Sequence, residues 1–220
     1  MITQKIIREQ SEVVKLKERF FNIRLFKSLL FAGYVVYLSL LIENLIFASF
    51  FGYNIVTNYI SELGMRSLIP FPHLNDFIVI LGGTISLFSN FFFVHRLKTQ
   101  YRPNRTSKVF IWLGFTAGII GAVGYIFLGI FSLDRAGPGE LYHGLSMGFS
   151  FGGFLTSIFF YSLNLFLTHN CSLKKVGIFG FTFPIIAIIV YGLVLNPLTE
   201  WIVLWSILAF LLPFYYYIFK

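Results

Sequence analysis

Long apolar runs separated by short polar stretches make up most of this chain of 220 residues. Six runs are each close to the length of about 20 residues that a helix needs to cross a bilayer. They lack the alternation of apolar and polar positions that is typical of membrane β-barrels. The pattern therefore predicts an all-α, polytopic integral membrane protein, a bundle of six transmembrane helices. The predicted spans are 29–51, 77–94, 109–133, 145–167, 176–195 and 201–219.

Residues 1–28 differ from the rest of the chain because they are polar and basic. Val13, Leu16, Phe20 and Ile23 recur at spacings of three and four between charged residues, as on one face of an amphipathic helix. We expect residues 1–28 to form a cytoplasmic arm on the inner leaflet. Residues 29–220 would form the membrane domain, with its first span as an uncleaved anchor.

Composition and charge support a membrane protein. Only 12% of the residues are charged, too few to coat a soluble domain of this length. Fifteen Lys and Arg residues lie in the N-terminal arm, the second and fourth connections and the C-terminal tail, whereas Arg66 and Arg135 are the other two. Because cytoplasmic segments carry the excess of Lys and Arg, both termini are predicted to be cytoplasmic in a cell-membrane protein. The same distribution explains the net charge of +8 without nucleic acid.

Acidic residues gather at the opposite, outer side. Asp76, Glu140 and Glu200 each stand near the predicted start of a span, where the helix dipole favours a carboxylate, and this position explains them. Glu43 and Asp134 lack that explanation, because Glu43 lies inside the first span and Asp134 follows the end of the third. A carboxylate inside a span is costly unless it is protonated or paired, so Glu43 indicates a functional site.

Further polar residues surround these acids in the sequence. His143 and Ser146 share one helical face at the start of the fourth span. In the first outer loop, Asn58 can cap a short helix that Gly64 ends. Folding of this loop onto the first and fourth spans would close an outward-facing polar pocket. The candidate ligand-binding residues are Glu43, Ser61, Glu62, His73, Asp134, Arg135, His143 and Ser146.

The fourth span contains the pattern G-x-S-x-G twice, around Ser146 and Ser150. In hydrolases this pattern serves a strained turn between a strand and a helix, but both copies here lie inside one predicted helix. Their glycines instead predict a smooth face for helix packing against a matching face of the third span, and glycine-lined faces could also join copies into a homo-oligomer. The predicted packing residues are Gly144, Gly148 and Gly152 of the fourth span and Gly114, Gly118 and Ala122 of the third.

Three functions fit these features. The first is the binding or handling of a lipid headgroup or small amphiphile at the outer leaflet, with membrane lipids as partners. The second is an intramembrane hydrolase or transferase acting on lipid, with His143, Asp134 and Glu62 as catalytic candidates. The third is an ion-coupled transporter that uses Glu43. We rank them in this order. No cofactor is predicted, although Asp134, His143 and Glu62 could bind a divalent cation.

Short segments of the membrane domain resemble a known family. They are "NYISELG" after the first span, "PHLN" before the second, and "FSLD" followed by "HG" between the third and fourth. In these segments the chain resembles the prokaryotic six-span family called domain of unknown function, number 998, which is distantly similar to the Frag/DRAM/Sfk group, tied to lipid organisation and anchor remodelling. The resemblance covers residues 29–219 and implies six spans and an outward-facing polar site, but no particular reaction. The residues that it implies for this site are Ser61, Glu62, His73, Asp134 and His143.

Overall fold

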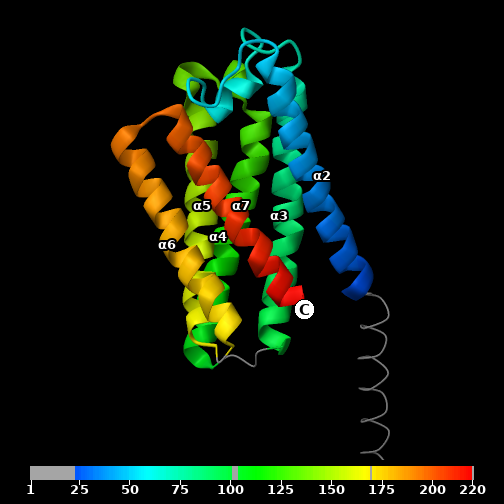
Figure 1. Ribbon diagram of the computed structural model, residues 1–220, viewed down its shortest axis with the longest axis vertical. Coiled ribbons are helices and arrows are strands. Elements are labelled where there is room, and N and C mark those ends of the chain that lie inside the picture. The colour runs from blue at the N-terminus through cyan, green and yellow to red at the C-terminus, as the bar shows by residue number, and fades with distance from the viewer. Residues whose placement is uncertain (1–22, 101–103, 169, 220) are drawn as a thin grey trace, which may run out of the picture.

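The computed structural model describes residues 23–100, 104–168 and 170–219, and these form an all-helical bundle (Figure 1). Six helices of the described residues are long and apolar enough to cross a membrane, which confirms the predicted six spans. They are α2 (Ile23–Ser49), α3 (Pro72–Gln100), α4 (Arg105–Ile130), α5 (Leu141–Phe166), α6 (Cys171–Val194) and α7 (Pro197–Phe219). Three short 3₁₀ helices connect them at one end: η1 (Ile60–Gly64), η2 (Leu133–Arg135) and η3 (Pro138–Glu140).

Every long helix begins several residues before the apolar run that predicted it. The largest difference is in α2, which starts at Ile23 and not at Leu29. Polar residues continue these helices because a helix satisfies its backbone hydrogen bonds internally, whether or not its side chains are apolar. The last residues of the predicted arm thus belong to α2, and its other residues lie outside the described part of the chain.

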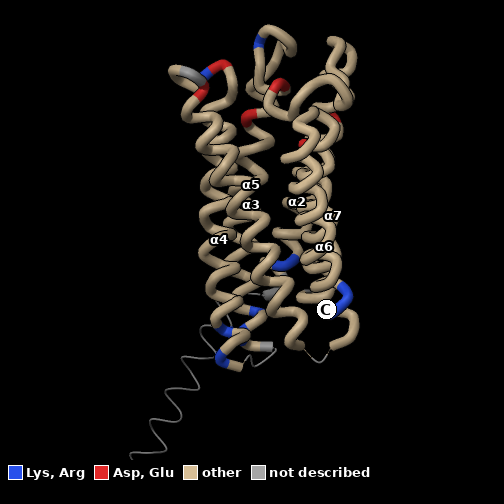
Figure 2. The backbone as a smooth tube through the Cα atoms, turned by 90° about the vertical axis from the view of Figure 1, so that its left-hand side faces the viewer, with Lys and Arg blue, Asp and Glu red and all other residues tan. Residues whose placement is uncertain are grey.

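Charged residues divide between the two ends of the bundle (Figure 2). Lys and Arg lie mainly at the end where α2 begins, and Asp and Glu lie mainly at the end that carries η1, η2 and η3. We call the second of these the outer end. Neighbours in the chain pack as neighbours in space: α4 lies against α3 and α5, and α6 lies against α5 and α7. Helix α2 stands at the side of the bundle and packs mainly on α3.

Helices α4 and α5 pack closely against each other, as predicted, but mainly through residues other than the predicted ones. A Cβ atom on Gly121 would lie 2.7 Å from the backbone nitrogen of Phe154, and one on Gly124 would lie 2.6 Å from that of Ser150. On the α5 side, Gly153 faces the backbone of Gly121. Only glycine fits at such positions, so these residues set the spacing between the two helices.

The prediction of the packing faces is therefore correct for Gly114 and wrong for the other residues named. Cβ atoms on Gly144, Gly148 and Gly152 would meet no atom of the described chain within 4 Å, so this glycine ladder lies on an open face of α5. In α4, Gly118 faces Asn90 of α3 and Gly114 faces Tyr161 of α5. The buried Ala122 belongs to the α3 contact, since its carbonyl oxygen lies 2.9 Å from a Cβ built on Gly83. Association of copies through the open ladder stays a prediction.

Polar side chains link the helices inside the bundle. Asn44 of α2 donates to Asn75 of α3 at 3.3 Å. The hydroxyls of Tyr37 and Tyr125 lie 2.9 Å apart. Ser89 and Tyr215 form a similar pair at 2.9 Å. Hydrogen bonds of this kind hold membrane helices together where apolar burial gives no preference for another helix over lipid.

Candidate functional site

The outer end of the bundle holds the polar residues that the sequence singles out. It consists of the connection between α2 and α3, which contains η1, and the connection between α4 and α5, which contains η2 and η3. The first turns of α3 and α7 complete it (Figure 1). Its polar residues form two separate sets: an exposed charged cluster and the polar lining of a small internal cavity.

The short helix η1 forms as predicted, with Glu62 as its local cap. One carboxylate oxygen of Glu62 accepts hydrogen bonds from the backbone nitrogen of Tyr59 at 3.1 Å and from the side chain of Asn58 at 2.8 Å. The N-cap is Tyr59 and not the predicted Asn58. Asn58 lies one residue before the N-cap and donates a hydrogen bond to Glu62. Both contacts lie within the turn, so the Glu62 oxygen that makes them serves the loop itself.

Contacts with α7 and with the residue that ends α6 fix the position of η1 and of the loop before it. The backbone nitrogen of Ile60 donates to a carboxylate oxygen of Glu200 at 2.8 Å, and the hydroxyl of Tyr59 donates to the carbonyl of Leu195 at 3.0 Å. The indole nitrogen of Trp201 donates to the hydroxyl of Tyr53 at 3.2 Å. Burial raises the pKa of the Tyr53 phenol, so this hydroxyl stays protonated and able to donate. The loop therefore rests on α7 and α3.

The charged cluster is centred on the buried carboxylate of Asp76 in α3, and we call it the outer cluster (Arg66, His73, Asp76, Asp134 and Arg135). One oxygen of Asp76 accepts from the Arg135 guanidinium at 2.5 Å and from Nδ1 of His73 at 3.2 Å. The Asp76 side chain is 8% exposed, whereas that of His73 is 65% exposed. The buried acid thus orients two groups that reach the surface.

The tautomer of His73 decides which of its ring nitrogens can accept a hydrogen bond. If Nδ1 carries the proton and donates it to Asp76, then Nε2 is an acceptor. A guanidinium nitrogen of Arg66 lies 3.3 Å from this Nε2, in position to donate. The backbone nitrogen of Arg66 also donates to Asp134 at 2.7 Å. The loop after η1 is in this way tied to both α3 and η2.

The second polar group lines a cavity of about 30 Å³ beneath η1, which we call the outer cavity. His143 is buried beside it, and its Nδ1 lies 2.9 Å from the carbonyl oxygen of Phe131. Because a carbonyl can only accept, Nδ1 is the donor, and Nε2 carries no proton when the ring is neutral. The polar residues lining the outer cavity are Ser61, Asn75, Tyr125, Ser132, His143 and Glu200.

The structure divides the predicted site residues among different surroundings. His73, Asp134 and Arg135 belong to the outer cluster, and Ser61 and His143 line the outer cavity. Ser146 donates to the carbonyl of its own helix at Tyr142, at 2.7 Å. Glu43 lies on an exposed face of α2, outside both the outer cluster and the lining of the outer cavity. Its neighbour Asn44 points inward.

Asp76 and Glu200 are the site residues that the sequence reading missed. The sequence pattern predicts that Asp76 opens a helix, but α3 begins at Pro72, which places Asp76 in the second turn. Its offset of three from His73 was the available signal, since residues three apart share a helix face. Glu200 does lie in the first turn of α7, as expected, and it additionally accepts the bond from Ile60.

A metal site is not assembled in the described part of the chain. No three His, Cys, Asp or Glu residues of residues 23–100, 104–168 and 170–219 come together in a group that could hold a metal ion. Asp134, His143 and Glu62, the candidate cation ligands, each have a different hydrogen-bonding partner. Cation binding by these residues stays a prediction.

Comparison with protein-family models, with curated proteins and with solved structures gives no match to this chain. The resemblance of its short motifs to the six-span family stays a prediction.

Proposed function

We propose that the outer cluster binds the anionic headgroup of a membrane lipid or small amphiphile, in a cell-membrane protein whose two termini are cytoplasmic. The observation that carries this proposal is that the guanidinium of Arg66 is exposed and has no carboxylate partner among the described residues. Its side chain is exposed, and its guanidinium contacts the imidazole of His73. No carboxylate of the described residues lies within 4.0 Å of this guanidinium, so its charge is open to an external anion.

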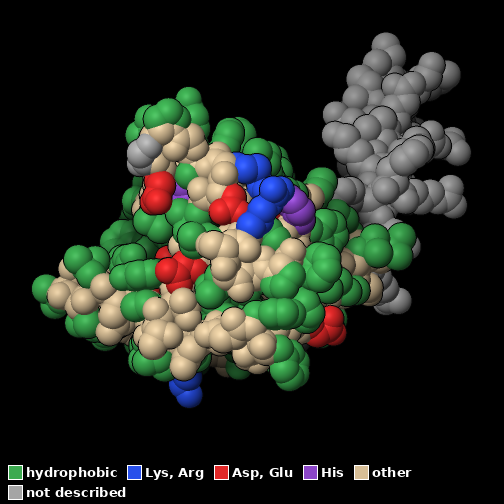
Figure 3. All heavy atoms as spheres, turned by 90° about the horizontal axis from the view of Figure 1, so that it is seen from above, with side chains coloured by type: hydrophobic (Ala, Val, Ile, Leu, Met, Phe, Trp, Pro, Cys, Tyr) green, Lys and Arg blue, Asp and Glu red, His purple; other side chains and the backbone are tan. Residues whose placement is uncertain are grey.

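The neighbours of Arg66 favour an anion at the same place. Arg135 lies against the other ring nitrogen of His73, at 3.4 Å, and is held there by Asp76. Seen from above, basic and imidazole side chains lie side by side on this face (Figure 3). Arginine suits this role because its planar guanidinium can bind two oxygens of a phosphate or carboxylate at once.

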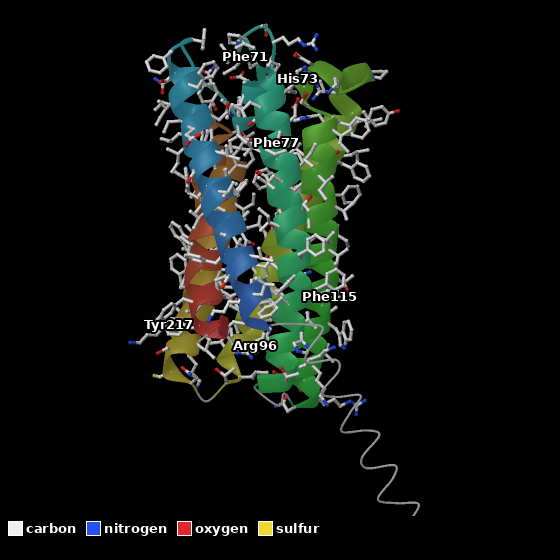
Figure 4. The ribbon with its side chains drawn as sticks, turned by 90° about the vertical axis from the view of Figure 1, so that its right-hand side faces the viewer. Phe71, His73, Phe77, Arg96, Phe115 and Tyr217 are labelled. Atoms are coloured by element: carbon white, nitrogen blue, oxygen red, sulfur yellow. The ribbon has the colours of Figure 1, made fainter. Side chains whose placement is uncertain are left out.

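Apolar side chains beside the cluster suit the rest of an amphiphile. Phe71 and Phe77 are 65% and 56% exposed. His73 lies at the outer end of α3 with Phe77 below it on the same helix (Figure 4). An anionic headgroup on Arg66 would thus place its acyl chain along exposed aromatic surface.

Photo-crosslinking in nanodiscs tests this proposal. The probe is a phosphatidylglycerol analogue with a diazirine near its headgroup, and labelled peptides are identified by mass spectrometry. We expect labelling around residues 66–77, and we expect the Arg66→Gln variant to lose it because the open charge is gone. Labelling near Lys174 and Lys175, at the opposite end of the bundle, should persist in both proteins and serves as the internal control.

A matched phosphatidylcholine probe distinguishes headgroup binding from general lipid contact. It should label residues 66–77 much less than the anionic probe does. Equal labelling by both probes, or unchanged labelling in Arg66→Gln, would refute the proposed headgroup site. The enzyme with His143 and the transporter with Glu43 stay lower-ranked predictions.

A further inference from the structure

Besides Ser162, three buried hydroxyl groups in the bundle have no hydrogen-bond partner of normal geometry among the described residues: those of Ser132, Ser150 and Tyr34, the last of which lies near Ser86 and Ser89. Their residues are 4%, 1% and 8% exposed. A buried polar group without a partner is costly, and in native proteins such groups are usually satisfied by internal water. The three hydroxyls therefore mark positions where water is expected.

The residues that carry these three hydroxyls each line a cavity of the right size. Ser132 lines the outer cavity. Ser150 and Tyr34 line a middle cavity of about 30 Å³, and Tyr34 also lines an inner cavity of about 30 Å³ together with Asn90 and Tyr161. A cavity of this volume with several polar partners can hold a water molecule.

The cavities follow one another through the bundle and share lining residues. Tyr125 lines both the outer and the middle cavity. Tyr34 and Ser86 line both the middle and the inner cavity. Tyr34 also borders a groove of about 340 Å³ between α2 and α7, which reaches Lys27 near the start of α2. Polar groups thus continue from His143 at the outer end to this groove.

We propose that these three cavities hold a chain of water molecules that conducts protons between the outer cavity and the α2–α7 groove. The hydroxyls along the chain can donate and accept at once, as proton hopping requires. His143 and Glu200 are the titratable groups where a proton enters or leaves at the outer end. Cavities of one water each have no room for a hydrated metal ion, so the chain selects protons. Polar groups buried in membrane spans commonly form such relays.

Internal water is tested by X-ray hydroxyl-radical labelling in ¹⁸O-water, which oxidises side chains next to bound water. Tyr125 and Tyr161 line the cavities and should be labelled although they are only 8% and 3% exposed. Phe92, which is 2% exposed and borders none of the three cavities, is the matched control and should stay unlabelled. Equal labelling of all three residues, or of none, would overturn the proposal.

Proton conduction is tested in phosphatidylcholine vesicles that contain a pH-sensitive dye and carry a potassium gradient with valinomycin. The wild-type protein should acidify or alkalinise the vesicles faster than protein-free vesicles. The Tyr34→Phe/Ser150→Ala variant, which keeps the core volume nearly constant, should lower this rate about tenfold or more, because the relay hydroxyls are lost.

A second pair of substitutions controls for damage to the fold. Ser162 is also buried without a partner, and like Tyr191 it borders none of the three cavities. The Tyr191→Phe/Ser162→Ala variant should therefore conduct like wild type. No flux from wild-type protein, or equal flux from the two double variants, would refute proton conduction. Arg66→Gln should leave the flux unchanged, so this test is independent of headgroup binding.

Discussion

At the scale of single residues, the carboxylate of Asp76 joins α3 to the connection between α4 and α5. It is 8% exposed and has Arg135 as its charged partner, with His73 as a second contact. Replacement of one partner of a buried ion pair is destabilising because the other charge is left without compensation. The Arg135 side chain is 36% exposed, and this exposure to solvent reduces the effect.

We therefore expect Arg135→Gln to lower the free energy of unfolding by about 1–3 kcal/mol, measured by denaturation in detergent micelles. Arg105→Gln, an exposed arginine at the other end of the bundle, should change it by less than about 0.5 kcal/mol. Adding Asp76→Asn to Arg135→Gln should recover part of the loss, because the buried charge is removed. Equal effects of the two arginine substitutions would show that the ion pair contributes nothing.

At the scale of helices, two adjacent glycines in α5 make opposite contributions to packing. Gly153 faces the backbone of Gly121 in α4, whereas a Cβ on Gly152 would meet nothing within 4 Å. Gly153→Ala should push α4 and α5 apart and lower stability. Gly152→Ala should raise it by about 0.5–1 kcal/mol, because alanine favours the helix over glycine.

Thermal unfolding of the two variants in the same detergent measures this difference. Since both substitutions add one methyl group to the same helix, each is the control for the other. Loss of stability in Gly152→Ala would mean that the open glycine ladder contacts something outside the single chain. Crosslinking of the purified protein would then show whether a second copy occupies that face.

At the scale of the whole molecule, the prediction concerns orientation in the membrane. Cys171 is the only cysteine of the chain and is exposed at the start of α6. In intact cells a membrane-impermeant maleimide should leave Cys171 unlabelled, because the charge distribution predicts that this end of the bundle lies in the cytoplasm. Permeabilised cells should show full labelling.

An introduced cysteine at the outer end provides the opposite readout. In a Cys171→Ser background, the Ser67→Cys variant should be labelled in intact cells, since Ser67 is exposed in the loop after η1. The reverse result at both positions would show that the topology is the opposite of the predicted one, with the proposed headgroup site at the inner leaflet.

The sequence by itself determined the features that depend on neighbours along the chain. Six apolar runs give six spans, because a membrane helix must satisfy its own backbone hydrogen bonds. The short helix at Ile60–Gly64 was also predictable, since Asn58, Glu62 and Gly64 provide a local cap and end. These elements form from interactions within a few residues.

Only the tertiary structure decided which face of each helix meets which neighbour. The glycine ladder of α5 lies open while its serine face packs on α4, Glu43 faces outward, and Asp76 pairs with Arg135, 59 residues away. In a soluble helix the apolar stripe would reveal the buried side. Here lipid and neighbouring helices are equally apolar, so the pattern of hydrophobic residues cannot separate them, and close packing and polar pairing decide instead.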